Sequence, residues 1–69
     1  MNSLITWSNN RIPIDKIDSV SGVFPCPYGY SFLIYTKEYP IFCDIIIKDT
    51  REEAVTMRDT VIEAMMEVE

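Results

Sequence analysis

Residues 50–69, TREEAVTMRDTVIEAMMEVE, contain the strongest structural signal in this 69-residue chain. Thr50 and Glu53 have the spacing of a capping box, in which the threonine hydroxyl accepts from the amide three residues later and the glutamate carboxylate reaches back. Apolar residues then recur at the three- and four-residue intervals of one helix face: Ala54, Met57, Val61, Ala64, Met65 and Val68. The stretch therefore predicts an amphipathic helix over about residues 50–68.

The apolar face of this helix is wider than one sheet needs. Val55, Ile62 and Met66 extend it to roughly 200° of the helix circumference, about twice what one sheet covers. Arg58 lies inside this arc, where its stem covers apolar surface while its guanidinium reaches water or an acid. Two interpretations stand. In one, the extra apolar area is simply exposed, as is common in small proteins; in the other, Val55, Ile62 and Met66 contact a second copy or another protein.

The same segment holds the whole net charge. Residues 49–69 contain seven acids and two bases, whereas residues 1–48 contain four of each, so the net charge of −5 belongs to the helical end. Nucleic-acid binding and docking on anionic membranes both need a basic surface, and neither is expected. Four acids share one stripe of the helix: Glu52, Asp59, Glu63 and Glu67. This acidic stripe is either a solvated outer face or an anionic surface for a basic partner.

Residues 30–48 have the alternation of two β-strands joined by a polar turn. Residues 30–36 are rich in β-forming residues on both faces, and a second run follows over residues 41–48. In that run, the odd-numbered set is wholly apolar and is expected to face the core. The even-numbered set includes two charges and is expected to face outward: Ile41, Cys43, Ile45 and Ile47 against Phe42, Asp44, Ile46 and Lys48.

The N-terminal part predicts shorter elements. Residues 3–14 predict a hairpin turning at Asn9-Asn10, because asparagine tolerates positive φ. A short turn and a strand over Ile17–Val20 follow, and the prolines and glycine of residues 24–29 predict a loop without regular structure. The whole chain, residues 1–69, is expected to form one domain, β-rich over 3–48. Its predicted fold class is α+β, an antiparallel sheet of four to five strands with one C-terminal amphipathic helix packed on one face.

Aromatic residues supply a second candidate contact surface. Tyr35 and Phe42 are expected on the side of the sheet away from the helix, together with Trp7. The loop over residues 24–28 is expected at the rim of this surface, since prolines hold its apolar side chains out at low entropic cost. Core packing is the commoner role of such side chains, and a contact surface for a partner is the alternative.

The composition gives little support for catalysis. The chain contains no histidine, the commonest general base, and no glycine-rich phosphate loop, so no catalytic residue, cofactor or metal site is expected. Cys26 and Cys43 are either two reduced thiols or one disulfide. No apolar run approaches the ~20 residues of a membrane span, and the N-terminus lacks the features of a signal peptide. We therefore expect a cytoplasmic protein of a bacterial cell or of a virus growing in one.

The stretch 11–20, RIPIDKIDSV, resembles a segment common in bacterial pleckstrin-homology-like domains. In that family a strand ends in Ile-Pro, a turn carries an acid and a base, and an Ile-x-x-Val strand follows. The later order, a hairpin of long strands and then a C-terminal helix across the sheet, is also similar. The resemblance implies a binding module or an assembly domain, and it supplies no catalytic residues.

These observations favour a small protein–protein interaction or assembly module that forms homo-oligomers, with another protein or a second copy of the chain as its partner. The alternative is an acidic inhibitor, such as a viral protein that imitates nucleic acid and occupies a basic surface of a host protein. A small-molecule pocket between the helix and residues 25–29 is a third alternative.

Overall fold

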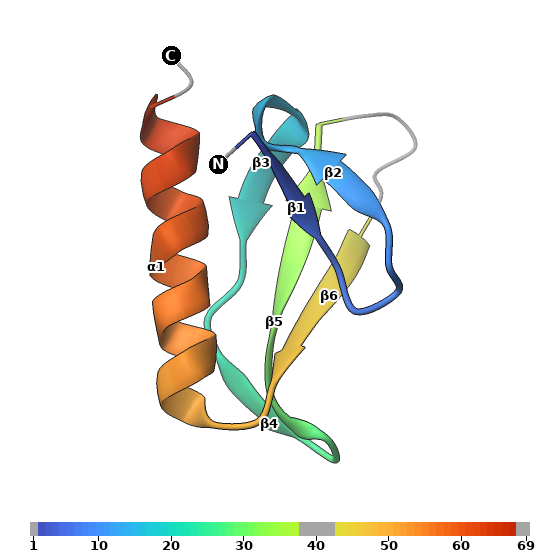
Figure 1. The fold of residues 1–69 in the computed structure, drawn as a ribbon, viewed down its shortest axis with the longest axis vertical. Helices are drawn as coiled ribbons and strands as arrows, with labels where there is room; N and C mark the ends of the chain where they lie inside the picture. Colours follow the sequence, from blue (N-terminus) through green and yellow to red (C-terminus); the bar gives the residue numbers. More distant parts are fainter. Residues whose placement is uncertain (1, 38–42, 68–69) are drawn as a thin grey trace.

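Strand β5 is the centre of the larger sheet (Figure 1). The computed structural model describes residues 2–37 and 43–67. Within them, β5 (Gly29–Thr36) pairs antiparallel with three strands: β3 (Ile17–Val20), β4 (Phe24–Cys26) and β6 (Cys43–Lys48). β6 runs along one edge of β5, and β3 and β4 share the other edge, each opposite a different half of β5. The predicted pairing of two long strands is thus confirmed for β5 and β6, but only β5 is central, because β6 forms an edge of the sheet.

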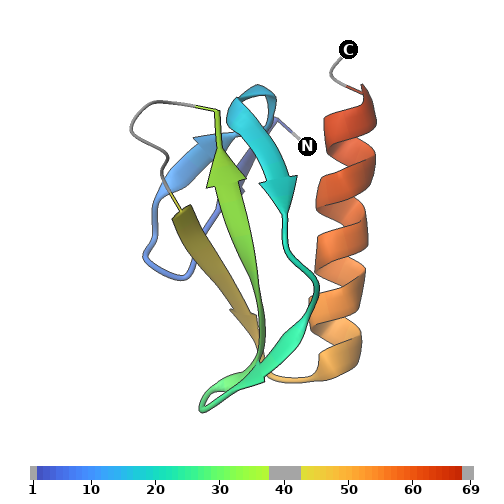
Figure 2. The ribbon, with the colours of Figure 1, turned by 180° about the vertical axis from the view of Figure 1, so that it is seen from behind.

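A separate two-stranded sheet precedes it. β1 (Ser3–Ile5) pairs antiparallel with β2 (Arg11–Pro13). Asn9 has a φ of 63°, and its amide donates to the Thr6 carbonyl at 2.9 Å, which confirms the predicted turn. A short 3-10 helix, η1 (Ile14–Lys16), then leads into β3, as expected for a turn followed by a strand. Figures 1 and 2 place this hairpin over one face of the four-stranded sheet.

Helix α1 (Arg51–Glu67) begins as the sequence predicts. The Thr50 hydroxyl accepts from the Glu53 amide at 3.2 Å and donates to the Glu53 carboxylate at 3.1 Å. In a capping box the Glu53 carboxylate would accept from the Thr50 backbone amide, whereas here it accepts from the Thr50 hydroxyl. The cap satisfies one of the amides that a helix start leaves without an intrahelical acceptor.

Replacing Thr50 with alanine is expected to lower the free energy of unfolding by about 1 kcal/mol, because it removes this cap. Urea denaturation measures the change. Thr56→Ala is the matched control, since Thr56 is exposed in the middle of α1 and alanine there raises helix propensity. Equal unfolding midpoints for the two variants would contradict the importance of the cap.

The core lies between α1, the β1–β2 hairpin and one face of the larger sheet. Ala54, Val61 and Ala64 are buried on α1, and Met57 and Met65 pack against the core from the same helix. The other buried apolar residues come from the hairpin, η1 and the sheet: Leu4, Ile12, Ile14, Ile17, Phe32, Ile34 and Ile46. The α+β class and the packing of the helix on one sheet face are therefore confirmed. Val68, also expected on this helix face, lies outside the described residues.

The prediction that residues 24–29 lack regular structure is wrong for Phe24–Cys26, which form β4. Pro25 lies opposite Tyr30 on β5, and an edge strand tolerates a proline because its outward side needs no ladder donor. The turn itself is confined to Pro27 and Tyr28. Prolines thus mark an edge strand here, which the composition of the segment alone could not distinguish from a loop.

The predicted facing of β6 is also wrong. Asp44 and Ile46 are 7% and 3% exposed, whereas Ile45 and Ile47 are only half-buried. Ile46 lies opposite the fully buried Phe32 of β5, so the even-numbered residues face the core. Both faces of β6 carry isoleucine, so apolar burial does not choose between them. The residue that decides which face is buried is Asp44, whose hydrogen-bond partners lie far away in the sequence. Ile41 and Phe42 lie outside the described residues.

Candidate interaction surfaces

Asp44 joins the β1–β2 loop to β6 through its buried carboxylate. Its Oδ2 accepts from the Thr6 hydroxyl at 2.8 Å and from the Asn10 side-chain amide at 2.9 Å. Its Oδ1 accepts from the Ile45 amide at 2.8 Å and from the Ser8 hydroxyl at 3.3 Å. The sequence reasoning missed this role. The one sequence feature that could have revealed this role is Asp44 itself, a single acid within an otherwise apolar stretch of strand.

These donors also set the protonation state of Asp44. Burial raises the pKa of the carboxyl, since the charged form loses hydration. Hydrogen bonds from Asn10, the Ile45 amide, Thr6 and Ser8 outweigh burial, and the pKa lies below its ordinary value of 3.8. The group is thus ionised at neutral pH and serves as an acceptor that fixes the loop over residues 6–10.

The same loop occupies part of the outer edge of β6. The Trp7 amide donates to the Ile45 carbonyl at 3.0 Å, and the Ile45 amide donates to Asp44. At the opposite edge, the Arg58 Nε donates to the Ser21 carbonyl, between β3 and β4, at 2.6 Å. The guanidinium therefore binds a backbone carbonyl, where the sequence suggested water or an acid. Both edges of the sheet are partly occupied, which opposes pairing with a strand from another chain.

The second face of the larger sheet has no described element over it (Figure 2). Strand alternation and the register place the following side chains on this open face: Ser19, Phe24, Cys26, Ser31, Leu33, Tyr35, Ile45 and Ile47. None of these eight is charged, and all except Ser31 are half-buried or exposed. Two exposed charged residues adjoin them at one end of the sheet: Asp18, in the β3 bulge next to Ser19, and Lys37, directly after β5. Cys26 carries a free thiol, which accepts from the Ser31 hydroxyl at 2.8 Å. Cys26 is therefore a reduced thiol, which is the first of the two alternatives that the sequence left open.

An exposed aromatic pair lies beside this face. The rings of Trp7 and Tyr28 stack with centroids 5.9 Å apart and an interplanar angle of 26°. They are 59% and 68% exposed. The pair joins the β1–β2 loop to the β4–β5 turn, and the Trp7 amide bonds to Ile45 at the β6 edge. Trp7 thus lies at the β6 edge, whereas Tyr35 is half-buried on the open face.

The three apolar residues that widen the helix face remain partly or largely exposed. Val55 and Ile62 are half-buried, and Met66 is 71% exposed. At about 100° per residue, all three lie beyond Arg58 as seen from the buried stripe of α1. Because Arg58 reaches the β3–β4 edge, this helix flank (Val55, Ile62 and Met66) turns toward the side of the molecule that bears the open face.

The acidic stripe points to solvent. Its four members are all exposed: Glu52, Asp59, Glu63 and Glu67. At about 100° per residue, Asp59, Glu52 and Glu63 lie farther round the helix from its buried stripe than Met66 does, and Glu67 follows them on the opposite side from Met66.

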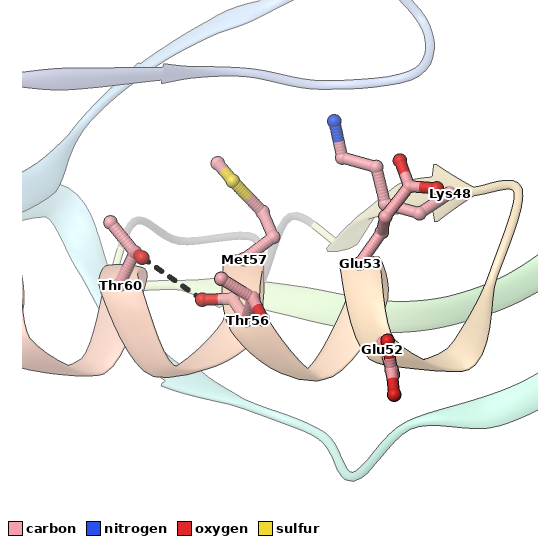
Figure 3. Close-up of a pocket in the computed structure, with 6 residues that line it drawn as sticks. All are labelled: Lys48, Glu52, Glu53, Thr56, Met57 and Thr60. Carbon is pink, nitrogen blue, oxygen red and sulfur yellow. Dashed lines mark hydrogen bonds between the residues drawn. The ribbon is translucent and has the colours of Figure 1, made fainter.

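A hollow of about 400 Å³ lies where the end of β6 meets the first half of α1 (Figure 3). It is lined by Lys48, Glu52, Glu53, Thr56, Met57 and Thr60. The Thr60 hydroxyl donates to the Thr56 carbonyl at 2.9 Å, so this polar group is used within the helix. None of the lining residues belongs to residues 25–29, where the sequence suggested a pocket. The hollow brings together charges of both signs and one methionine, without converging polar groups that define a ligand.

Among the described residues, no helix has the length and hydropathy of a membrane-crossing segment.

The fold and these surfaces together define an α+β chain with one largely apolar sheet face that none of the described elements covers, and one acidic helix stripe. Comparisons with protein-family models, curated protein sequences and solved structures find no match. The resemblance to pleckstrin-homology-like domains stays a prediction.

Proposed function

We propose that the chain is a small cytoplasmic protein–protein interaction or assembly module that associates with itself. The open face is the observation that supports this proposal. Leu33 lies opposite Ile45, and Ile47 lies beside Ile45 on the same strand face, with Tyr35 beside Leu33. Single exposed apolar residues are normal on protein surfaces, but contiguous apolar faces are typical of interaction sites.

The size of the chain favours the same conclusion. A domain of about this length buries only about 60% of the surface of its unfolded chain, and such a core supplies about 3–5 kcal/mol at most. A second copy that binds only the folded state adds stability by mass action. Self-association would thus stabilise a fold whose own core is small.

Sedimentation equilibrium of the full chain, from micromolar to near-millimolar concentration, tests the proposal. We expect the average mass to rise above 8.0 kDa with concentration, and the melting temperature to rise in parallel because association is linked to folding. A monomer mass across the whole range, with a constant melting temperature, would rule out self-association.

The second candidate function is that of an acidic inhibitor of a nucleic-acid-binding protein. The exposed acidic stripe of α1 supports it, since Asp59, Glu63 and Glu67 form a row of negative charge along the helix. The test is competition with labelled duplex DNA for a panel of basic DNA-binding proteins. Displacement by the wild type that disappears in D59N/E63Q/E67Q supports this function. Displacement that is absent, or unchanged in the triple variant, contradicts it.

A further inference from the structure

We infer that two copies of the chain pack their open faces against each other about a two-fold axis, with the helix flanks at the rim of the contact. This inference rests on the proposed self-association and specifies how it occurs. Three properties of the structure lead to it: the state of the sheet edges, the distribution of charge and the size of the available side.

The sheet edges argue for contact through the face. An exchanged or added strand needs free backbone groups along an edge. The amide and carbonyl of Ile45 on β6 are already bonded to Asp44 and Trp7, and Arg58 binds the Ser21 carbonyl at the other edge. The open face, in contrast, has no described element against it (Figure 2). Packing of one sheet on another therefore uses the surface that the fold leaves free.

The charge distribution selects a second copy over a charged partner. In a two-fold contact each surface meets itself, so a charge near the axis would meet a like charge. The centre of the open face, at Leu33, Ile45 and Ile47, carries no charge, and the adjoining charges of Asp18 and Lys37 lie at one end of it. The net charge of −5 belongs to the helical end, and Asp59, Glu52 and Glu63 of the acidic stripe face away from the sheet, beyond Met66. Two chains with five excess negative charges each can thus meet at this face.

The size of the contact requires the helix flank. The molecule extends 31 × 25 Å across its shortest axis, so even the rectangle that encloses this whole side barely reaches the roughly 800 Å² that each partner buries in a standard interface. The sheet alone is three strands wide, about 10–14 Å at the usual strand spacing, and supplies only part of this area. Ile62 and Val55 on α1 extend the apolar surface beyond the β3–β4 edge.

Three glutamate substitutions test the arrangement. Leu33→Glu places a charge at the centre of the open face, and Ile62→Glu places one on the helix flank. Ile5→Glu is the matched control, because Ile5 is 48% exposed on the β1–β2 hairpin, which covers the opposite face of the sheet. We expect L33E to weaken dimerisation by more than about tenfold, I62E to weaken it by about tenfold, and I5E to leave it unchanged, since a buried unpaired charge costs at least one decade of affinity. Circular dichroism of each variant tests whether it is folded.

A measurement on the unmodified chain avoids any effect of the substitutions on folding. In a dilution series followed by amide NMR, the shifts of Leu33, Tyr35 and Ile47 are expected to change with concentration, while those of Ile5 and Arg11 stay constant. A dimer that survives L33E, or whose shifts change on the hairpin alone, overturns the face-to-face arrangement and leaves self-association intact. A chain that is monomeric at every concentration overturns both.

Discussion

Asp44→Ala is expected to lower the free energy of unfolding by about 3 kcal/mol, because hydrogen bonds to a charged acceptor contribute about 1.5–3 kcal/mol each and their donors would lose their partner. Thr6 is itself buried at 5% exposure, so its hydroxyl would have no water to replace the carboxylate. For a chain of this size, such a loss corresponds to a fall in melting temperature of more than about 10 °C. Thermal unfolding followed by circular dichroism measures it.

Asp59→Ala is the control for this prediction. Asp59 is exposed on α1, and alanine is the better helix former, so its loss is expected to change the melting temperature little or raise it. Nearly equal melting temperatures for D44A and D59A would show that the carboxylate does not hold the loop over residues 6–10 in place.

The pH dependence of stability follows from the same group. The folded state holds the pKa of Asp44 below its ordinary value of 3.8, to which it returns in the unfolded chain. The ionised carboxylate therefore contributes stability at pH values above the unfolded pKa, and this contribution is lost as the pH falls through the folded pKa. We expect the wild type to lose stability below about pH 4 more steeply than Asp44→Asn does. Parallel stability curves for the two proteins in this range would contradict the assignment.

Gly29→Ala is the second substitution with a large expected effect. Gly29 has a φ of +135°, a region that residues with a Cβ rarely adopt, and a Cβ there would overlap the Lys48 carbonyl oxygen. The Asp49 carbonyl oxygen is the next neighbour, at 3.1 Å. Both obstacles are backbone atoms at the junction between β6 and α1, so neither can turn aside. Strain of this kind costs about 1–3 kcal/mol before the overlap is added, and we expect about 3 kcal/mol or more in urea denaturation.

Gly22→Ala provides the internal comparison. A Cβ at Gly22 meets no atom within 4 Å, so the substitution is expected to change stability by less than about 0.5 kcal/mol. If G29A unfolded at the same urea concentration as G22A, the close approach of the two backbones at the β4–β5 turn would be wrong.

The sequence predicted those elements whose signals are local. The capping residues Thr50 and Glu53 fix the start of α1, because their partners lie within four residues. Asn9 likewise marks the hairpin turn, since positive φ is a property of a single residue. The strand over Ile17–Val20 and the alternation of β5 were also identified from neighbouring residues. For the same reason, the sequence predicted the buried residues of the helix face, Ala54, Val61 and Ala64.

The candidate surfaces were predicted only in part. Trp7, Tyr35 and the flank of Val55, Ile62 and Met66 were chosen from the sequence, and the structure shows each of them partly or largely exposed. The sequence could not place the helix flank relative to the open face of the sheet. That placement depends on Arg58, whose bond to Ser21 spans 37 positions of the chain.

The sequence by itself determined the helix, the hairpins and the acidic end, because hydrogen bonds and periodicities within a few residues decide these features. Tertiary structure alone decided which face of β6 is buried. Both faces carry isoleucine, so burial of apolar area does not choose between them. The choice is made by Thr6, Ser8 and Asn10, which approach Asp44 from 34 to 38 residues away and make its burial favourable. Because these hydrogen bonds hold Asp44 on the core side of β6, Ile45 and Ile47 lie on the open face, where the proposed contact lies.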